Sequence, residues 1–352
     1  MTRMTKVWCD RAIVRVWLIP IALFSIVAIG SWQFDRLNQP PDISQLPISR
    51  TDELVEEPIR PIPLQLALDP RKVELGDKLF HDRQLSRNNT ISCASCHDLA
   101  LGGTDGLVFS VGIDGHLGTV NAPAVFNSGF NFKQFWDGRA DTLEDQIEGP
   151  ANSLREFGSS WSDIIAKLKN SPEYTALFKQ IYSDEIAREN IKDAIATFER
   201  SLITPNSRFD RFLRGDKTAI TSEEKQGYDL FKSYGCASCH QGVNVGGNMF
   251  QKLGIFESYS NLKKKLFESD LGRYNVTKDV RDRYIFKVPT LRNIELTAPY
   301  LHDGSAKTLE EVIQIMAKYQ LGRELPGKDT ESIIKFLNTL TGQYQGTMLS
   351  EL

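Results

Sequence analysis

The sequence predicts a mainly α-helical protein that consists of two tandem domains of related sequence. Apolar residues recur at helical spacing in most segments, and no long run alternates between apolar and polar residues as an extended sheet would. One stretch of the chain also repeats another: residues 121–147 parallel residues 287–313, with a Pro, an Asp and a Thr-Leu-Glu triplet at the same offsets. With 352 residues, the chain is long enough for two domains that each bury a core.

Composition and charge exclude several classes of protein. Hydrophobic residues make up 41% and charged residues 25% of the chain, as in globular proteins. The net charge is −3, and the one short basic run, Lys263–Lys265, is typical of a solvated face, so we expect no nucleic-acid partner. Five cysteines are too few for a disulfide scaffold, and Cys9 is the only one outside a repeated motif.

The amino terminus predicts export. An uncharged run of 19 residues, 16–34, follows four basic residues: Arg3, Lys6, Arg11 and Arg15. As a helix this run would be about 28 Å long, close to the thickness of one hydrocarbon core. We therefore assign residues 1–35 to a signal anchor or a signal peptide with a cleavage site near 28–30, and either alternative places the rest in the periplasm.

The remaining chain divides into three parts. Six prolines in residues 36–63 predict an extended linker, because proline cannot donate to a regular hydrogen-bond ladder. We assign residues 64–215 to an N-terminal domain and residues 216–346 to a C-terminal domain. Apolar stripes predict helices at 186–202, 309–316 and 333–340, and glycine-rich loops are expected at 102–118 and 242–254.

The motif Cys-Ala-Ser-Cys-His occurs once in each domain. Two thiols three positions apart can add to the two vinyl groups of one haem, and the adjacent histidine then reaches the iron. A zinc site would need further ligands that no neighbouring cluster supplies, and a thioredoxin-like pair would not explain the histidine. We therefore predict two covalent haem c groups, held by Cys93, Cys96 and His97 and by Cys236, Cys239 and His240.

The other axial ligands are predicted to differ. Met316 lies on the apolar face of the 309–316 helix. This pattern fits a methionine that ligates the second iron and equally fits a methionine of the core. Tyr319 is the alternative ligand. The equivalent segment of the first domain, 143–157, has no methionine or histidine. It offers Gln146, Pro150 and Glu156 instead, so the first iron is expected to stay open to a small molecule. From the pattern of residues alone, Glu156 fits a solvated loop glutamate better than a functional group.

From about residue 64 to 345 the sequence closely resembles the bacterial dihaem cytochrome c peroxidases. The resemblance rests on "SCASCHDLALGGTDG", "NAPAVFN", "FWDGRADTLEDQIEGP", "GCASCHQGVNVGG", "LRNIELTAPYLHDG" and "IMAKYQLG". The wider family includes the dihaem enzymes that mature methylamine dehydrogenase, in which a tyrosine replaces the axial methionine. The resemblance implies a c-type cytochrome fold in each domain and a homodimer.

The resemblance also implies an activity. The N-terminal haem would reduce hydrogen peroxide, and the C-terminal haem, with Met316 as its ligand, would accept electrons from a small cytochrome c, a cupredoxin or a quinol. Glu156 would move a proton between the peroxide oxygens, and Gln146 and Pro150 would line the same pocket. Trp136 would relay electrons between the haems.

Further residues are assigned by the same resemblance. Asn121, with the backbone carbonyls of Thr297 and Pro299, would hold a calcium ion. In relatives that need reductive activation, a loop histidine caps the first iron, and Ile113 occupies that position here. His116 lies three residues later in a glycine-containing loop and is the candidate distal ligand if the backbone shifts; the alternative is an exposed side chain. An enzyme without such a cap would need no activation.

The two other histidines outside the motifs are not expected to bind iron. His302, in the "PYLHDG" segment, is expected to form hydrogen bonds, and His81 is expected on the surface.

Two alternatives remain open from the sequence. One is an oxidase that modifies a partner protein through long-range electron transfer, and the other is an electron carrier without enzymatic activity. Met316 at the position of the tyrosine argues against the first alternative, and a first haem with both axial positions filled would favour the second.

Overall fold

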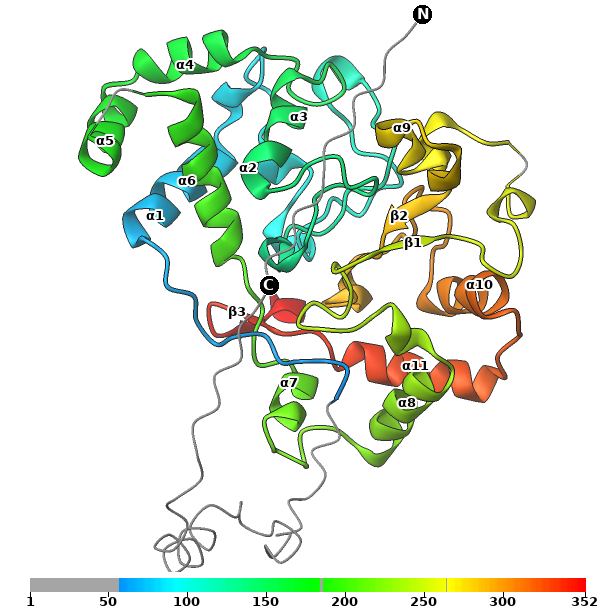
Figure 1. Cartoon of the computed structure of the whole chain (residues 1–352). Helices are drawn as coiled ribbons and strands as arrows, with labels where there is room; N and C mark the ends of the chain where they lie inside the picture. The colour runs from blue at the N-terminus through cyan, green and yellow to red at the C-terminus, as the bar shows by residue number, and fades with distance from the viewer. Residues whose placement is uncertain (1–56, 184–185, 264) are drawn as a thin grey trace, which may run out of the picture. The chain divides into compact units, whose positions relative to one another are not determined.

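The computed structural model describes residues 57–183, 186–263 and 265–352 (Figure 1). These residues form mainly helices, as the sequence predicts. The predicted anchor at 1–35, Cys9 and residues 36–56 of the predicted linker lie outside the described residues. Within the described part, none of the helices is both long and apolar enough to cross a membrane.

The first core is organised by two crossing helices, α1 (Pro70–His81) and α6 (Arg188–Ser201). Asp69 caps α1 by accepting a hydrogen bond from the backbone N–H of Arg71, and Pro70 occupies the first turn, where no N–H is needed. A Cβ atom on Gly76 would lie 2.0 Å from the carbonyl oxygen of Ala194. Glycine is therefore required at this position for the two helices to approach so closely.

The second core repeats this arrangement with α8 (Ser222–Ser233) and α11 (Gly327–Asn338). A Cβ atom on Gly227 would lie 1.9 Å from the carbonyl oxygen of Ser332. Gly76 and Gly227 occupy matching positions in the duplicated segments "LGDKLF" and "QGYDLF". The same close helix crossing therefore supports both copies, and α10 (Leu309–Leu321) packs beside the second one.

The remaining elements are short. The other helices are α2 (Leu143–Gln146), α3 (Glu148–Asn152), α4 (Trp161–Lys169), α5 (Pro172–Tyr182), α7 (Arg208–Leu213) and α9 (Tyr274–Thr277). The strands form two antiparallel pairs, β1 (Phe250–Lys252) with β2 (Ile285–Lys287) and β3 (Gln343–Tyr344) with β4 (Thr347–Met348). In the first pair Phe250 lies opposite Lys287. Long loops connect these elements and carry most of the candidate site residues.

The chain segments that meet in each core differ from the predicted boundaries. Residues 57–63 are not a free linker, because Ile59 and Ile62 are buried and the N–H of Arg60 donates to the carbonyl of Gly242 over 3.2 Å. Helix α7 packs in the second core, although it precedes the predicted boundary at 215. Leu349 returns to the first core from the end of the chain. Apolar contacts to distant residues, which a composition shift does not reveal, decide these assignments.

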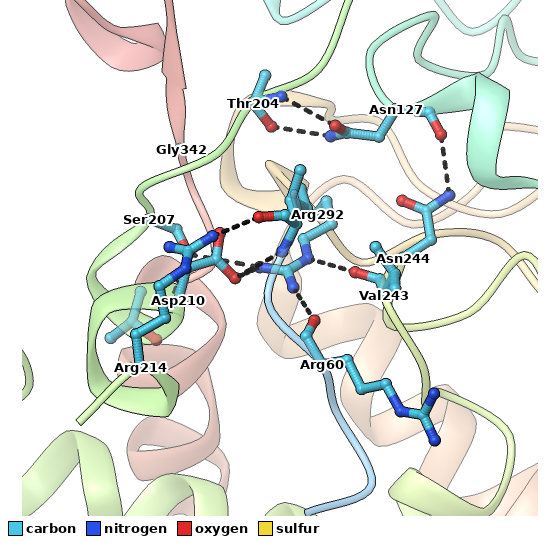
Figure 2. A network of polar contacts seen from close by, with 12 residues as sticks. Arg60, Asn127, Thr204, Ser207, Asp210, Arg214, Val243, Asn244, Arg292 and Gly342 are labelled. Carbon is cyan, nitrogen blue, oxygen red and sulfur yellow. Dashed lines mark hydrogen bonds and ion pairs between the residues drawn. The ribbon is translucent and has the colours of Figure 1, made fainter. Parts of the chain in front are cut away.

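A buried polar network fixes the entering segment to the second core (Figure 2). The side chains of Arg292 and Asp210 are fully buried and form an ion pair of 2.7 Å. The Arg292 guanidinium also donates to the carbonyls of Val243 at 2.9 Å and Arg60 at 2.8 Å. Ser207 Oγ accepts from the Asp210 N–H and so starts α7. These bonds satisfy a charge that would otherwise be costly to bury.

A second set of polar contacts joins the two cores (Figure 2). Asn127, from the first domain, donates to Thr204 Oγ1 at 2.8 Å and accepts from the Thr204 N–H at 2.9 Å. Its carbonyl accepts from Asn244 at 3.2 Å, and Asn293 donates to the same Thr204 hydroxyl at 3.1 Å. The loop after the second Cys-Ala-Ser-Cys-His motif is thereby held against the first domain.

Candidate active site

Both Cys-Ala-Ser-Cys-His motifs fold into the same tight turn. In the first, the N–H groups of Cys96 and His97 donate to the carbonyl of Cys93 at 3.1 and 3.0 Å. In the second, the equivalent N–H groups donate to the carbonyl of Cys236 at 3.2 and 3.0 Å. No disulfide involves these four cysteines. Each turn thus presents two thiols and one imidazole together, which is the donor set that covalent haem attachment requires.

The two histidines are held in the orientation of an iron ligand. Nδ1 of His97 lies 3.3 Å from the carbonyl oxygen of Gly103, and Nδ1 of His240 lies 3.3 Å from that of Val245. A carbonyl partner assigns the proton to Nδ1 and leaves Nε2 available as a ligand. Burial lowers the pKa of His97 and lowers that of His240 to about 4, so both imidazoles are neutral at physiological pH, as ligation requires.

Two adjoining cavities lie next to His97. The smaller, of about 60 Å³, is lined by His97, Gln146, Pro150 and Glu156 together with apolar side chains. The larger, of about 940 Å³, shares His97, Gln146 and Glu156 and extends to Trp136. Its volume is within the range typical of ligand sites, ~300–1,000 Å³. The structure therefore brings together the residues that the sequence predicted for the first haem pocket.

Glu156 is held by its own loop. Its N–H donates to the carbonyl of Ser153 at 3.0 Å, and its carbonyl accepts from the N–H of Ile113 at 3.1 Å. Burial raises the pKa of the Glu156 carboxyl, while the nearby Arg139 guanidinium and a hydrogen bond to Ser153 partly offset the rise. A carboxyl with a raised pKa at a cavity wall is suited to exchange protons near neutral pH.

Ile113 and His116 belong to the loop that carries a capping histidine in some relatives, and their side chains differ in burial. Ile113 is 1% exposed, and its side chain fills the space where a Cβ atom on Gly158 would lie. His116 is exposed and lines neither cavity. In the described conformation, His116 lies outside both cavities next to His97, and its role as a distal ligand stays a prediction.

Trp136 lines the larger His97 cavity and packs against the same buried cluster as Met316. This cluster includes the buried residues Tyr259 and Phe286. Its indole Nε1 donates to the carbonyl of Asn121 at 2.9 Å. One rigidly held aromatic ring thus contacts both regions.

The predicted ligand of the second haem lies beside an aromatic cluster. Met316 is half-buried in α10, where it packs against the cluster of Leu253, Tyr259 and Phe286. Tyr319, the alternative ligand, is 6% exposed, and its carbonyl accepts from the N–H of Phe256 at 3.0 Å. Ligation by Met316 stays a prediction.

A buried cluster of Asp270, His302 and Asp303 was not predicted. Nε2 of His302 lies 2.8 Å from Asp270 Oδ1, and the ring lies edge-on to Trp136 with centroids 6.3 Å apart. The Lys263 ammonium forms an ion pair with Asp303 and lies 3.8 Å from Asp270. The ammonium offsets one of the two carboxylate charges of this cluster. His81, by contrast, is exposed, as expected.

Asn121 and Thr297, two of the predicted calcium residues, form hydrogen bonds through atoms that calcium would not use. Asn121 is 7% exposed, its side-chain nitrogen donates to the carbonyl of Leu107 at 2.8 Å, and its N–H donates to the carbonyl of His302 at 2.8 Å. The Thr297 hydroxyl donates to the carbonyl of Ile294 at 3.3 Å. The calcium site, which would also use the carbonyl of Pro299, remains untested.

Glu199 is a cavity residue that the sequence reasoning missed. It is 6% exposed in α6, lines both cavities, and its Oε2 accepts no hydrogen bond from any described residue. Burial raises the pKa of its carboxyl to about 8. The signal was present in the sequence: Glu199 lies four residues after Ile195 and three before Leu202, on the apolar stripe of its helix.

Comparisons with known proteins agree with this site. Residues 70–218 match the family model described as di-haem cytochrome c peroxidase. The chain is 49% identical over 289 residues to cytochrome c peroxidase Ccp of Escherichia coli. This match covers 82% of this chain but only 62% of that relative's length. It is 45% identical over 287 residues to cytochrome c551 peroxidase of Nitrosomonas europaea, covering 81% of this chain and 84% of the relative.

A solved structure has the same fold. It is the crystal structure of a MauG-like protein associated with microbial copper homeostasis, which is 29% identical and has a TM-score of 0.71. The likeness covers 83% of this chain and 95% of that one. The expected fold class, mainly α with two cytochrome c-like domains, is confirmed.

Proposed function

The chain is an enzyme of the di-haem cytochrome c peroxidase family, and we propose that it reduces hydrogen peroxide to water with electrons from an external donor. The reaction would occur at the haem held by His97, and electrons would enter at the haem held by His240 and Met316. The observation that carries the proposal is the shared cavity of His97, Gln146, Pro150 and Glu156, in which the described residues contribute no second iron ligand of the histidine or methionine type.

Haem iron, when bound, would supply the redox chemistry that none of these side chains can provide. The protein residues would position peroxide and its protons. Glu156, with its raised pKa, would accept the proton of the inner peroxide oxygen and return it to the outer oxygen, so that water leaves. Gln146 and Pro150 would restrict the space beside this carboxyl and orient the peroxide.

Trp136 would relay electrons between the two sites. It lines the His97 cavity and packs against the cluster to which Met316 also packs. Its hydrogen bond to the carbonyl of Asn121 fixes the plane of the ring. A fixed aromatic ring keeps the distance between the electron-entry site and the peroxide site constant.

Several finer features of the proposal come from the family resemblance. The donor would be a small cytochrome c, a cupredoxin or a quinol, and the protein would act in the periplasm as a homodimer. A calcium ion would be bound by Asn121, Thr297 and Pro299. Because His116 is exposed, the enzyme would be active without reductive pre-activation.

A second candidate function is an oxidase that modifies a partner protein, which the likeness to a MauG-like protein favours. The two candidates differ in the ligand of the second iron. Met316 lies in the aromatic cluster beside Trp136, whereas Tyr319 lies outside that cluster. Spectra of the Met316→Ala and Tyr319→Phe variants would separate them, because only loss of the true ligand removes the low-spin signal of the second haem.

The test is peroxide turnover by the holoprotein with both haems attached, with a reduced small cytochrome c as the electron donor. The proposal expects oxidation of two donor molecules for each peroxide consumed. Absence of donor-dependent turnover in fully loaded holoprotein would overturn it. A preparation in which the first haem stays low-spin and ignores both peroxide and cyanide would instead indicate an electron carrier.

A further inference from the structure

Lys287 is a buried cation without a counter-charge. Its side chain is 5% exposed, and no hydrogen bond or ion pair of its ammonium with any described residue is present. Burial lowers its pKa to about 8, and no neighbouring carboxylate offsets this effect. Buried lysines are normally paired, because an isolated ammonium in a poorly solvated site is costly. A carboxylate beside this ammonium would offset the cost of its burial.

The lysine lies in the wall of the larger cavity, which also contains His97 and Cys96. Three other basic side chains line this cavity, and each has a partner. Arg139 pairs with Asp137 at 3.1 Å, Arg155 donates to the carbonyl of Leu117 at 2.9 Å, and Lys263 pairs with Asp303. Lys287 is thus the one unpartnered cation among the described residues of the cavity wall.

The backbone holds Lys287 in a fixed position. Its N–H donates to the carbonyl of Trp136 at 2.8 Å, and it pairs across the β1–β2 sheet with Phe250. Lys287 occupies the position of Asn121 in the duplicated segments, and the carbonyl of Asn121 accepts from the Trp136 indole. The backbone carbonyl of Trp136 thus accepts from Lys287, and its indole donates to Asn121. Of these two equivalent positions, only the one in the second domain carries a positively charged side chain.

We propose that Lys287 forms an ion pair with a propionate carboxylate of the haem attached at Cys93 and Cys96. A haem seated on His97 would bring its two carboxylates into the cavity that this lysine lines, where Lys287 is the buried basic side chain without a partner among the described residues. The lysine belongs to β2, which packs with the second domain, so the ion pair connects the second domain to the haem of the first.

The consequence is electrostatic. Ferrous haem carries one positive charge fewer than ferric haem, so a positive charge nearby stabilises the ferrous form and raises the reduction potential. Lys287 would raise the potential of the haem held by His97 and favour electron transfer towards it through the adjacent Trp136. The inference rests on the haem attachment in the proposed function, but it does not depend on peroxide turnover.

Spectroelectrochemical titration of the holoprotein tests this inference. In Lys287→Met, the midpoint potential of the His97 haem should shift downwards while that of the His240 haem stays unchanged, and the resonance Raman propionate-bending mode should shift. Lys287→Arg should restore both signals, because the positive charge returns. Lys252→Met is the matched control: this exposed lysine belongs to the partner strand β1, and both potentials should stay as in the wild type.

Three results would overturn the inference. One is unchanged potentials and Raman bands in Lys287→Met; another is a shift confined to the His240 haem. The third is a wild-type potential that changes with added acetate but ceases to do so in Lys287→Met, because the anion would then be diffusible. Loss of the characteristic absorption bands of haem c in the wild type would instead refute the cofactor itself, so the two failures are distinguishable.

Discussion

The backbone N–H of Ile113 donates a hydrogen bond to the carbonyl of Glu156 over 3.1 Å. This bond joins the loop before the Asn-Ala-Pro segment to the loop that carries the candidate proton-transfer group. The two loops are in close contact, because a Cβ atom on Gly112 would lie 1.8 Å from the carbonyl oxygen of Arg155. The conformation of one loop therefore limits the conformation of the other, and substitutions at Ile113 should affect the first haem directly.

Substitution of Glu156 should abolish most of the turnover. Glu156→Gln retains the shape of the side chain but cannot exchange a proton, so kcat with peroxide should fall about 10²–10⁴-fold. Stopped-flow oxidation of the reduced donor measures this change. Glu173→Gln, at an exposed glutamate, should behave as the wild type. Equal turnover of Glu156→Gln and the wild type would show that another group moves the proton.

A histidine at position 113 should introduce reductive activation. The expected electron paramagnetic resonance spectrum of the oxidised wild-type holoprotein has one high-spin signal and one low-spin signal. Ile113 packs against Gly158 and lines neither cavity, so Ile113→His requires this loop to shift before the imidazole reaches the pocket beside Glu156. With the imidazole in the pocket, the high-spin signal should become low-spin and turnover should be delayed until the protein is partly reduced.

The control for this experiment is His116→Ala. Because His116 is exposed, its removal should leave the wild-type spectrum unchanged. A wild-type spectrum with two low-spin signals, of which one becomes high-spin in His116→Ala, would contradict the prediction and identify His116 as the cap.

Substitution of Glu199 should change the pH dependence of stability. Burial raises the pKa of this carboxyl to about 8, whereas the unfolded chain releases the proton near pH 4.5. Between these values the folded state binds more protons than the unfolded state, so the wild type loses stability as pH rises, by up to ~1.4 kcal/mol per pH unit. Glu199→Gln lacks this titration, and its Tm relative to the wild type should increase from pH 5 to pH 8.

Thermal unfolding of both holoproteins across this pH range checks the prediction. Glu173→Gln again serves as the control, because its carboxylate is 63% exposed and should leave the pH profile unaltered. Parallel pH profiles for the wild type and Glu199→Gln would show that the carboxyl is paired in the folded holoprotein.

Removal of one partner of the Arg292–Asp210 pair should destabilise the second core. Asp210→Ala leaves the fully buried guanidinium without its counter-charge, so the free energy of unfolding should fall by about 3–5 kcal/mol. Denaturant unfolding of the holoprotein measures this loss. Asp229→Ala breaks an exposed pair with Lys225 and should change stability by less than about 1 kcal/mol. Similar losses in the two variants would contradict the assigned role of burial.

Much of the candidate site follows from local sequence. The attachment residues are adjacent in the chain, so Cys93, Cys96 and His97 are recognisable without a fold. The helix containing Glu199 was also predicted, but a glutamate on an apolar stripe indicates a functional group only when the surface it faces is known. The buried cluster of Asp270, His302 and Asp303 could not be predicted in this way. No motif or spacing in the sequence relates His302 to Asp270 or to Lys263.

The sequence by itself determined the helical class, the duplication and the two attachment motifs, because these depend on periodicity and on residues close together in the chain. Only the tertiary structure decided which segments share a core. It placed Ile59 in the second core and Leu349 in the first, and it placed Lys287 of the second domain in the cavity of His97. Such contacts join residues more than a hundred positions apart, and burial in a shared core selects them without leaving a local pattern.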